Sequence, residues 1–174
     1  MSGSTDLTKY IKKAVRQGAA EGKVVSPSRV FTADWVRIKC QYGCGGYGQC
    51  LTCPPYSPEP QTTRRLLDSY NRAILFHFVI PADKEDPDIR RMVVGLEQAL
   101  FLDGYYRAFA MACGPCEVCA DCDFDDCRNP DLARPAMEAC GIDVFATARD
   151  AGYPIEVVKS TGDTQDRYAL VLVD

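Results

Sequence analysis

Apolar side chains recur every three or four residues in several parts of the chain. Near the N-terminus this spacing predicts an amphipathic helix over residues 5–18, with lysines on its opposite face. The strongest helical pattern runs from Asp88 to Leu102, where Asp88 stands near the N-terminus and Gly104 follows the end. Shorter helices are expected over three further segments, 62–70, 135–140 and 143–151, the last of them capped by Asp143.

Other segments have the apolar or β-branched composition of strands. Ala73 to Ile80 is apolar at nearly every position, which predicts a strand buried on both faces of a covered sheet. Its single histidine, His77, is expected to be a satisfied core residue. The other expected strands are 30–39, 105–112, 155–159 and 168–173, and a polar turn between the last two predicts a hairpin. These elements predict an α/β fold, one domain over residues 1–174 with a mixed sheet of about five strands and cysteine-rich loops at strand ends.

Five of the ten cysteines lie between residues 113 and 127. A bacterial ferredoxin spaces its ligands as C-x2-C-x2-C-x3-C-P, because two-residue gaps aim successive sulfurs at neighbouring corners of one cubane. One register that fits here is Cys116, Cys119, Cys122 and Cys127, with one extra spacer residue before the last thiol. The other runs from Cys113 to Cys122 with every gap at two. Either register predicts a metal or cluster site in residues 113–130, called the second loop below.

Four more cysteines follow the predicted strand 30–39, in a glycine-rich stretch over residues 40–56, called the first loop. They are Cys40, Cys44, Cys50 and Cys53. Glycines between them let the backbone wrap closely around a bound centre, and Pro54-Pro55 stiffens the exit. The glycines also match G-x-G-x-x-G, but no helix follows them, so a dinucleotide fingerprint is rejected. Because both loops follow predicted strands, we expect them at one edge of the sheet.

Disulfides and zinc are the alternatives to an iron–sulfur cluster. Ten cysteines in 174 residues is below the density of a small disulfide scaffold, and the chain opens on a polar segment without the apolar core of a secretory signal. Zinc with four thiolates usually separates its two C-x2-C pairs by a dozen or more residues, so the short gaps favour a cluster. The tenth cysteine, Cys140, ends a predicted helix and is either a small buried residue or a further ligand.

The net charge of −4 is unevenly distributed along the chain. Residues 1–72 carry 11 Lys and Arg against 5 Asp and Glu, whereas residues 73–174 carry 9 against 19. Aspartates surround the second-loop thiols at positions 121, 123, 125 and 126, which argues against a nucleic-acid surface. No apolar run approaches the roughly 18 residues of a membrane span. We therefore expect a cytoplasmic protein that binds neither nucleic acid nor membranes.

Three parts of the sequence form a recognisable set. They are Cys40-Gln-Tyr-Gly-Cys44 with Cys53-Pro-Pro-Tyr-Ser-Pro, Gly114-Pro-Cys116-Glu-Val-Cys119, and the stretch from Cys127 to Val144 that contains Ala-Arg-Pro-Ala-Met-Glu-Ala-Cys. Together they resemble a family of cysteine-rich proteins of about this length, known as predicted metal-binding proteins. The resemblance covers roughly residues 36–158 and implies metal binding without a particular activity. It implies as ligands Cys40, Cys44, Cys53, Cys116, Cys119, Cys122 and Cys127, and it leaves Cys50 and Cys113 outside the pattern.

The functional expectation follows from the thiols. No Ser–His–Asp set, phosphate loop or paired carboxylates indicate conventional hydrolase or transferase chemistry, and no catalytic residue is assigned. We expect one or two [4Fe-4S] clusters that pass single electrons to a redox partner protein in an anaerobic pathway. One alternative is a reductase whose first-loop cluster is held by Cys40, Cys44 and Cys53 alone, leaving an open iron for substrate. The other is a zinc-binding structural or interaction module.

Overall fold

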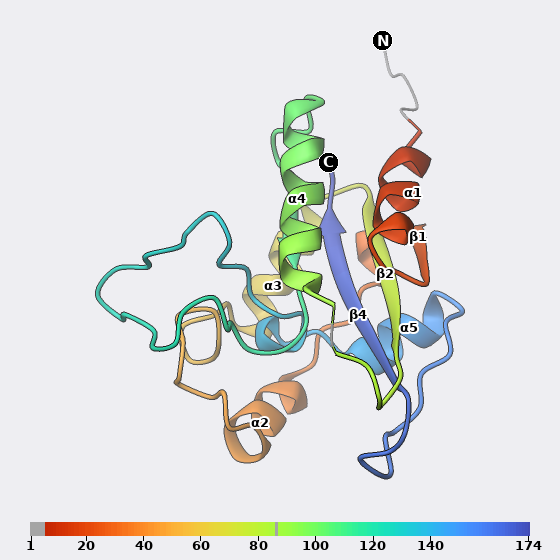
Figure 1. The fold of residues 1–174 in the computed structure, drawn as a ribbon. Helices are drawn as coiled ribbons and strands as arrows, with labels where there is room; N and C mark the ends of the chain where they lie inside the picture. The colour runs from red at the N-terminus through yellow and green to blue at the C-terminus, as the bar shows by residue number, and fades with distance from the viewer. Residues whose placement is uncertain (1–5, 86) are drawn as a thin grey trace.

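The computed structural model describes residues 6–85 and 87–174. At its centre lies an antiparallel sheet in the order β1-β2-β4-β3 (Figure 1). The strands are β1 (Glu21–Val25), β2 (Ala73–Ile80), β3 (Phe109–Met111) and β4 (Gln165–Leu172). β2 and β4 pair along their whole length, from Ala73 opposite Leu172 to Ile80 opposite Gln165. The expected α/β class is confirmed, with four strands in the described residues in place of about five.

Helices cover both faces of the sheet (Figure 1). α1 (Thr8–Arg16) and α4 (Ile89–Leu102) pack on one face, where Phe76 and Phe78 of β2 are buried against Leu96. α3 (Pro60–Asp68) and α5 (Val144–Asp150) pack on the other face, where Leu75 is buried with Leu67. Successive residues of a strand point to opposite faces, so a sheet covered on both sides requires the unbroken apolar run of β2. This confirms the expectation for that strand.

The strongly patterned helices begin and end close to their expected positions. Asp88 caps α4, its carboxylate accepting from the backbone N–H of Arg91 at 2.9 Å, and Asp143 caps α5 in the same way through Ala146. α1 and α3 lie within two or three residues of their predicted bounds, and residue 5 of the predicted first helix is outside the described residues. Segment 135–140 forms only a 3-10 turn, η2 (Glu138–Cys140). No helix in the described ranges has the length and apolarity to span a bilayer.

The predicted strand 30–39 is wrong. Its greater part belongs to a helix, α2 (Asp34–Gly43). The strand prediction relied on the bulk of Phe31 and Trp35, but those side chains are 40% and 51% exposed, so they pack in no sheet. In the helix only Val36 is buried, and the half-buried Arg37 is fixed by distant parts of the chain. Tertiary contacts have overridden local strand propensity here.

The predicted C-terminal hairpin is also wrong. Segment 155–159 forms no strand, and Val157 is 64% exposed. β4 pairs instead with β2 and β3, which come from much earlier in the chain. The sheet gains the edge strand β1, which the sequence pattern did not predict, and β3 is shorter than the expected segment 105–112.

Candidate metal centre

The second loop leaves the sheet after β3 and is held at both ends by α4. The guanidinium of Arg90, a residue only 9% exposed, donates to the carbonyl oxygens of Gly114 at 3.1 Å and Pro115 at 2.9 Å. It also donates to the carbonyl oxygen of Arg134, a few residues beyond the loop. A buried cation satisfied by three carbonyl oxygens therefore ties the start of the loop to the chain that follows its end.

An ion pair between Glu97 of α4 and Arg134 reinforces this connection. The Arg134 guanidinium donates to both oxygens of Glu97, at 2.8 and 2.6 Å, and the two side chains are only 17% and 14% exposed. Glu97 raises the pKa of Arg134, and its carboxylate also accepts from the backbone N–H of Ala110 in β3 at 2.7 Å. The exit of the second loop is thereby joined to the strand that leads into it.

Five cysteines line a cavity of about 560 Å³ beside this loop. They are Cys50 of the first loop and Cys116, Cys119, Cys122 and Cys127 of the second. The side-chain amide of Asn129 donates to the Cys119 sulfur at 3.0 Å. Cys113 is half-buried and packs instead against the apolar core next to α4. Of the two registers considered, only Cys116 to Cys127 has all four thiols in the cavity wall.

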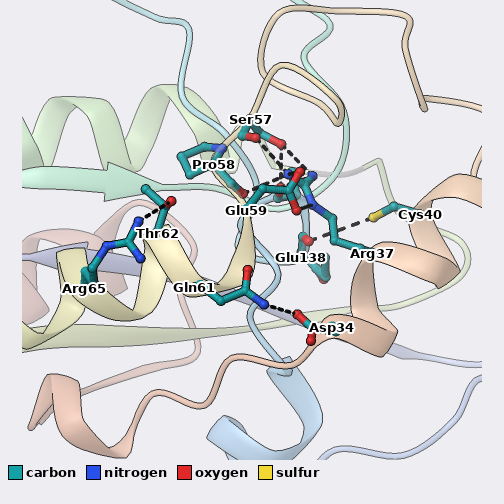
Figure 2. A network of polar contacts seen from close by, with 11 residues as sticks. Asp34, Arg37, Cys40, Ser57, Pro58, Glu59, Gln61, Thr62, Arg65 and Glu138 are labelled. Atoms are coloured by element: carbon teal, nitrogen blue, oxygen red, sulfur yellow. Dashed lines mark hydrogen bonds and ion pairs between the residues drawn. The ribbon is translucent and has the colours of Figure 1, made fainter.

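The first loop starts on a helix, not at the end of a strand. Arg37 of α2 is the centre of the contacts that fix it (Figure 2). The Arg37 guanidinium donates to the carbonyl oxygens of Ser57 at 2.8 Å, Pro58 at 2.9 Å and Ala139 at 2.9 Å, and it lies 3.3 Å from Glu59. The hydroxyl of Ser57 donates to the same Ala139 oxygen at 2.5 Å. These bonds join α2, the exit of the first loop and the turn before Cys140.

The two thiols nearest α2 lie in different surroundings. Cys40 is half-buried on the helix, and its sulfur lies 3.9 Å from the carbonyl oxygen of Glu138 (Figure 2). Burial, together with the charges of Cys44 and Glu138, raises the pKa of Cys40. Cys44 is exposed, and its sulfur accepts from the backbone N–H of Gly46 at 3.4 Å.

Cys50 and Cys53 are buried next to the start of the second loop. Burial and a hydrogen bond with Cys50 raise the pKa of Cys53 to about 12. Burial also acts to raise the pKa of Cys50, but hydrogen bonds with the Thr52 hydroxyl at 3.4 Å, the backbone of Cys116 and the Cys53 thiol outweigh it and lower that pKa. The backbone of Cys116 in the second loop thus acts to lower the pKa of both thiols.

The loops also pack against each other away from the sulfurs. A Cβ atom on Gly46 would lie 3.2 Å from the Cβ of Pro115, closer than an ordinary van der Waals contact, so the two loops approach each other closely at this glycine. The rings of Tyr56 and Phe124 are in contact, with centroids 5.3 Å apart. The two loops lie together through these contacts, but the sequence argument for it is wrong: the first loop continues from α2, and the sheet is antiparallel, not mixed as expected.

Cys140 lies in the core on the α3 and α5 side of the sheet, fully buried with Leu67, Met137 and Ile142. Burial raises its pKa to about 12, which favours the neutral thiol that apolar surroundings prefer. This placement corresponds to a small buried residue.

We expect Cys140→Ala to leave the amount of bound metal unchanged, because the thiol has apolar packing partners. The serine variant should lose about 1–3 kcal/mol of unfolding free energy, since it buries a hydroxyl in that core. Metal per chain and urea denaturation of both variants test this. Loss of metal from the alanine variant while its fold persists would instead make Cys140 a ligand.

His77 takes no part in either loop. Its Nε2 lies 2.7 Å from a carboxylate oxygen of Asp166, and its ring stacks on Tyr168. With 5% exposure it is the satisfied core histidine that the sequence predicted.

Five of the cysteines line one cavity, but their sulfurs do not form a complete coordination sphere. In the ranges 6–85 and 87–174, no three Cys, His, Asp or Glu side chains converge on a point with the geometry of a metal site. The donor set of the cavity is nevertheless all sulfur, the ligand type that iron–sulfur clusters and zinc take. The residues present fit either group. Arginine anchors and the Asn129 donor are features that the cysteine spacing did not reveal.

Comparison with known proteins places these loops in a family context. The family described as predicted metal-binding protein (DUF2284) matches residues 23–173, a range that includes both cysteine loops and their arginine anchors. No curated protein and no solved structure matches the chain. The matched range extends beyond the motifs on which the resemblance was based and covers most of the fold. The chain belongs to the DUF2284 family of predicted metal-binding proteins.

Proposed function

We propose that this protein is an iron–sulfur protein that binds a [4Fe-4S] cluster in the second loop and transfers single electrons. The observation that carries the proposal is the cavity of about 560 Å³ with five cysteines in its wall. Its volume falls within the roughly 300–1,000 Å³ of sites for small molecules and cofactors. A structural zinc ion is enclosed by its four ligands, so the open volume favours a cluster over zinc.

A hydrogen bond to one of the second-loop sulfurs supports a redox role. The side-chain amide of Asn129 donates to the sulfur of Cys119 at 3.0 Å. Reduction of a thiolate-bound cluster adds negative charge, and N–H donors to sulfur stabilise the more negative state, so they raise the reduction potential. When bound, the cluster would supply one-electron transfer. The protein's own residues would hold it, set its potential and limit access of water.

Acidic side chains at the cavity support a partner with a basic surface. Glu117, Asp121 and Asp123 line the cavity together with the cysteines. Complementary charges speed the encounter of redox proteins and orient them. The expected redox partner protein would therefore present lysines or arginines to the second loop, and its reaction rate would fall as salt screens these charges.

A first-loop cluster with an open iron is the second candidate. The burial of Cys140 in the core favours it, because that thiol is then not available as a fourth ligand of Cys40, Cys44 and Cys53. Titrating the reduced protein with cyanide and recording its electron paramagnetic resonance spectrum separates the two candidates. A new signal that is absent in Cys44→Ser would indicate an open iron, whereas an unchanged spectrum supports the carrier.

The identity of the metal is the first experimental test. We expect anaerobically purified protein to be brown, to contain iron and acid-labile sulfide, and to bleach with dithionite, because thiolate-bound clusters absorb visible light in the oxidised state. Elemental analysis, sulfide determination and a visible spectrum measure these properties on one sample. A colourless protein that holds zinc and no iron would reject both redox candidates and leave the zinc module.

A further inference from the structure

We infer that Cys50 supplies one of the four thiolates of the second-loop centre and takes the place of one of the four second-loop thiols in the cavity wall, so that the two cysteine loops bind metal as one composite site. The inference rests on the proposed metal centre but not on the choice between iron and zinc. Neither the ligand set implied by the family resemblance nor the ferredoxin-like spacing includes Cys50. Its assignment comes from where the fold places its side chain.

The position of Cys50 in the cavity is the first step of the argument. Although it belongs to the first loop, it lines the same cavity as Cys116, Cys119, Cys122 and Cys127, and its neighbours Gln49, Leu51 and Thr52 line that cavity with it. It is only 4% exposed. The four residues from Gln49 to Thr52 thus form the part of the cavity wall that the first loop supplies.

Contacts between the loops fix this wall in place. The backbone of Cys116 acts to lower the pKa of both Cys50 and Cys53, which agrees with a position of these two thiols close to the start of the second loop. The close approach of Gly46 to Pro115 and the ring contact of Tyr56 with Phe124 hold the loops together on either side. A centre in this cavity would therefore be within reach of Cys50 without movement of the core.

The other three thiols of the first loop are arranged differently. Cys40 and Cys44 are near each other, and Cys40 lies by the carbonyl oxygen of Glu138, away from the cavity wall. Cys53 contacts Cys50 but does not line the cavity. Among the four first-loop thiols, all within the described residues, Cys50 is the one that lines the cavity. On metal binding its thiol would release a proton to water, and the sulfur lone pair would form the new bond.

The test measures whether Cys50 contributes to metal binding by the second loop in a protein whose first loop has no other thiol. In the full-length chain, Cys40, Cys44 and Cys53 are replaced by serine, and Co(II) binding is followed by its thiolate charge-transfer absorption, with or without the additional Cys50→Ser change. Cobalt takes the thiolate ligands of zinc and reports their number whether or not the natural metal is iron. We expect Cys50→Ser to weaken Co(II) binding about tenfold or more, because even the loss of a residue that only supports a metal ligand typically lowers metal affinity by about that factor.

Equal Co(II) affinity and an equal charge-transfer band in the two variants would overturn the inference. Cys140→Ala in the same background is the matched control, because that thiol is buried in the core and should change neither quantity. If the triple variant does not fold, the same comparison is made in the Cys53→Ser chain. A protein that contains only zinc would reject the iron–sulfur proposal and leave this result standing.

Discussion

Replacing Arg90 with alanine should destabilise the protein by about 3 kcal/mol or more and remove most of its bound metal. The substitution deletes a buried cation and leaves the carbonyl oxygens of Gly114, Pro115 and Arg134 without their donor. Hydrogen bonds to charged groups contribute about 1.5–3 kcal/mol each, and the alanine variant also loses the packing of a side chain that is only 9% exposed. Urea denaturation and metal per chain measure the two effects.

Arg91→Ala is the matched control for this experiment. The neighbouring arginine is on the same helix, but its guanidinium forms an exposed pair with Asp88 at 3.1 Å, and its side chain is 68% exposed. Such pairs contribute about 0.5 kcal/mol or less. The Asp88 cap uses the backbone N–H of Arg91, so it survives the substitution. If both variants behave alike, α4 does not anchor the second loop in the way described.

Replacing Cys119 with serine should abolish metal binding in the second loop and lower the stability of the metal-loaded protein. A hydroxyl is a poor substitute for a thiolate towards iron or zinc, and metal binding is coupled to ordering of the ligand loop. The same outcome is expected for the two of Cys116, Cys122 and Cys127 that bind together with Cys119 and Cys50, whereas the variant of the third should keep its metal. Metal per chain, the visible spectrum and thermal unfolding with and without metal provide the measurements.

Cys113→Ser separates a ligand from a neighbouring thiol. Cys113 is three residues from Cys116 but packs against the apolar core, so the variant should keep its metal and be less stable. A reversed result, in which Cys113→Ser strips the metal and Cys127→Ser does not, would mean that the ligands run from Cys113 to Cys122.

The parts of the fold that the sequence predicted well have one strong pattern each. β2 is apolar at nearly every position because it is buried on both faces, and α4 has both a cap and a continuous apolar stripe. β1 was missed because its sequence, Glu-Gly-Lys-Val-Val, contains a glycine and two charged residues, as an edge strand tolerates. α2 was misassigned because the contacts of Arg37 outweigh a local preference for strand.

The sequence predicted the cysteines of the candidate site but not the arginine side chains that fix the two loops. Cysteine spacing indicated both loops, since ligands of one centre must be close in the chain or brought together by a turn. The arginine anchors contact backbone carbonyl groups 20 or more residues away, and a carbonyl group has no signature in the sequence. The contact of Cys50 with the second loop likewise depends on how two loops dock, which spacing within one loop cannot express.

The link that Arg90 makes between Gly114 and Arg134 has a consequence for the chain entropy of metal uptake. Bringing the ends of a free segment of about 20 residues together costs on the order of 3 kcal/mol. In this protein the contacts of Arg90 already hold the two ends together in the folded chain, so this entropy is lost on folding and not on metal binding. The thiols are therefore confined to a small volume at a high effective concentration, and uptake has only the interior of the loop left to order. Such a loop can gain or lose its metal while the sheet and its helices stay folded.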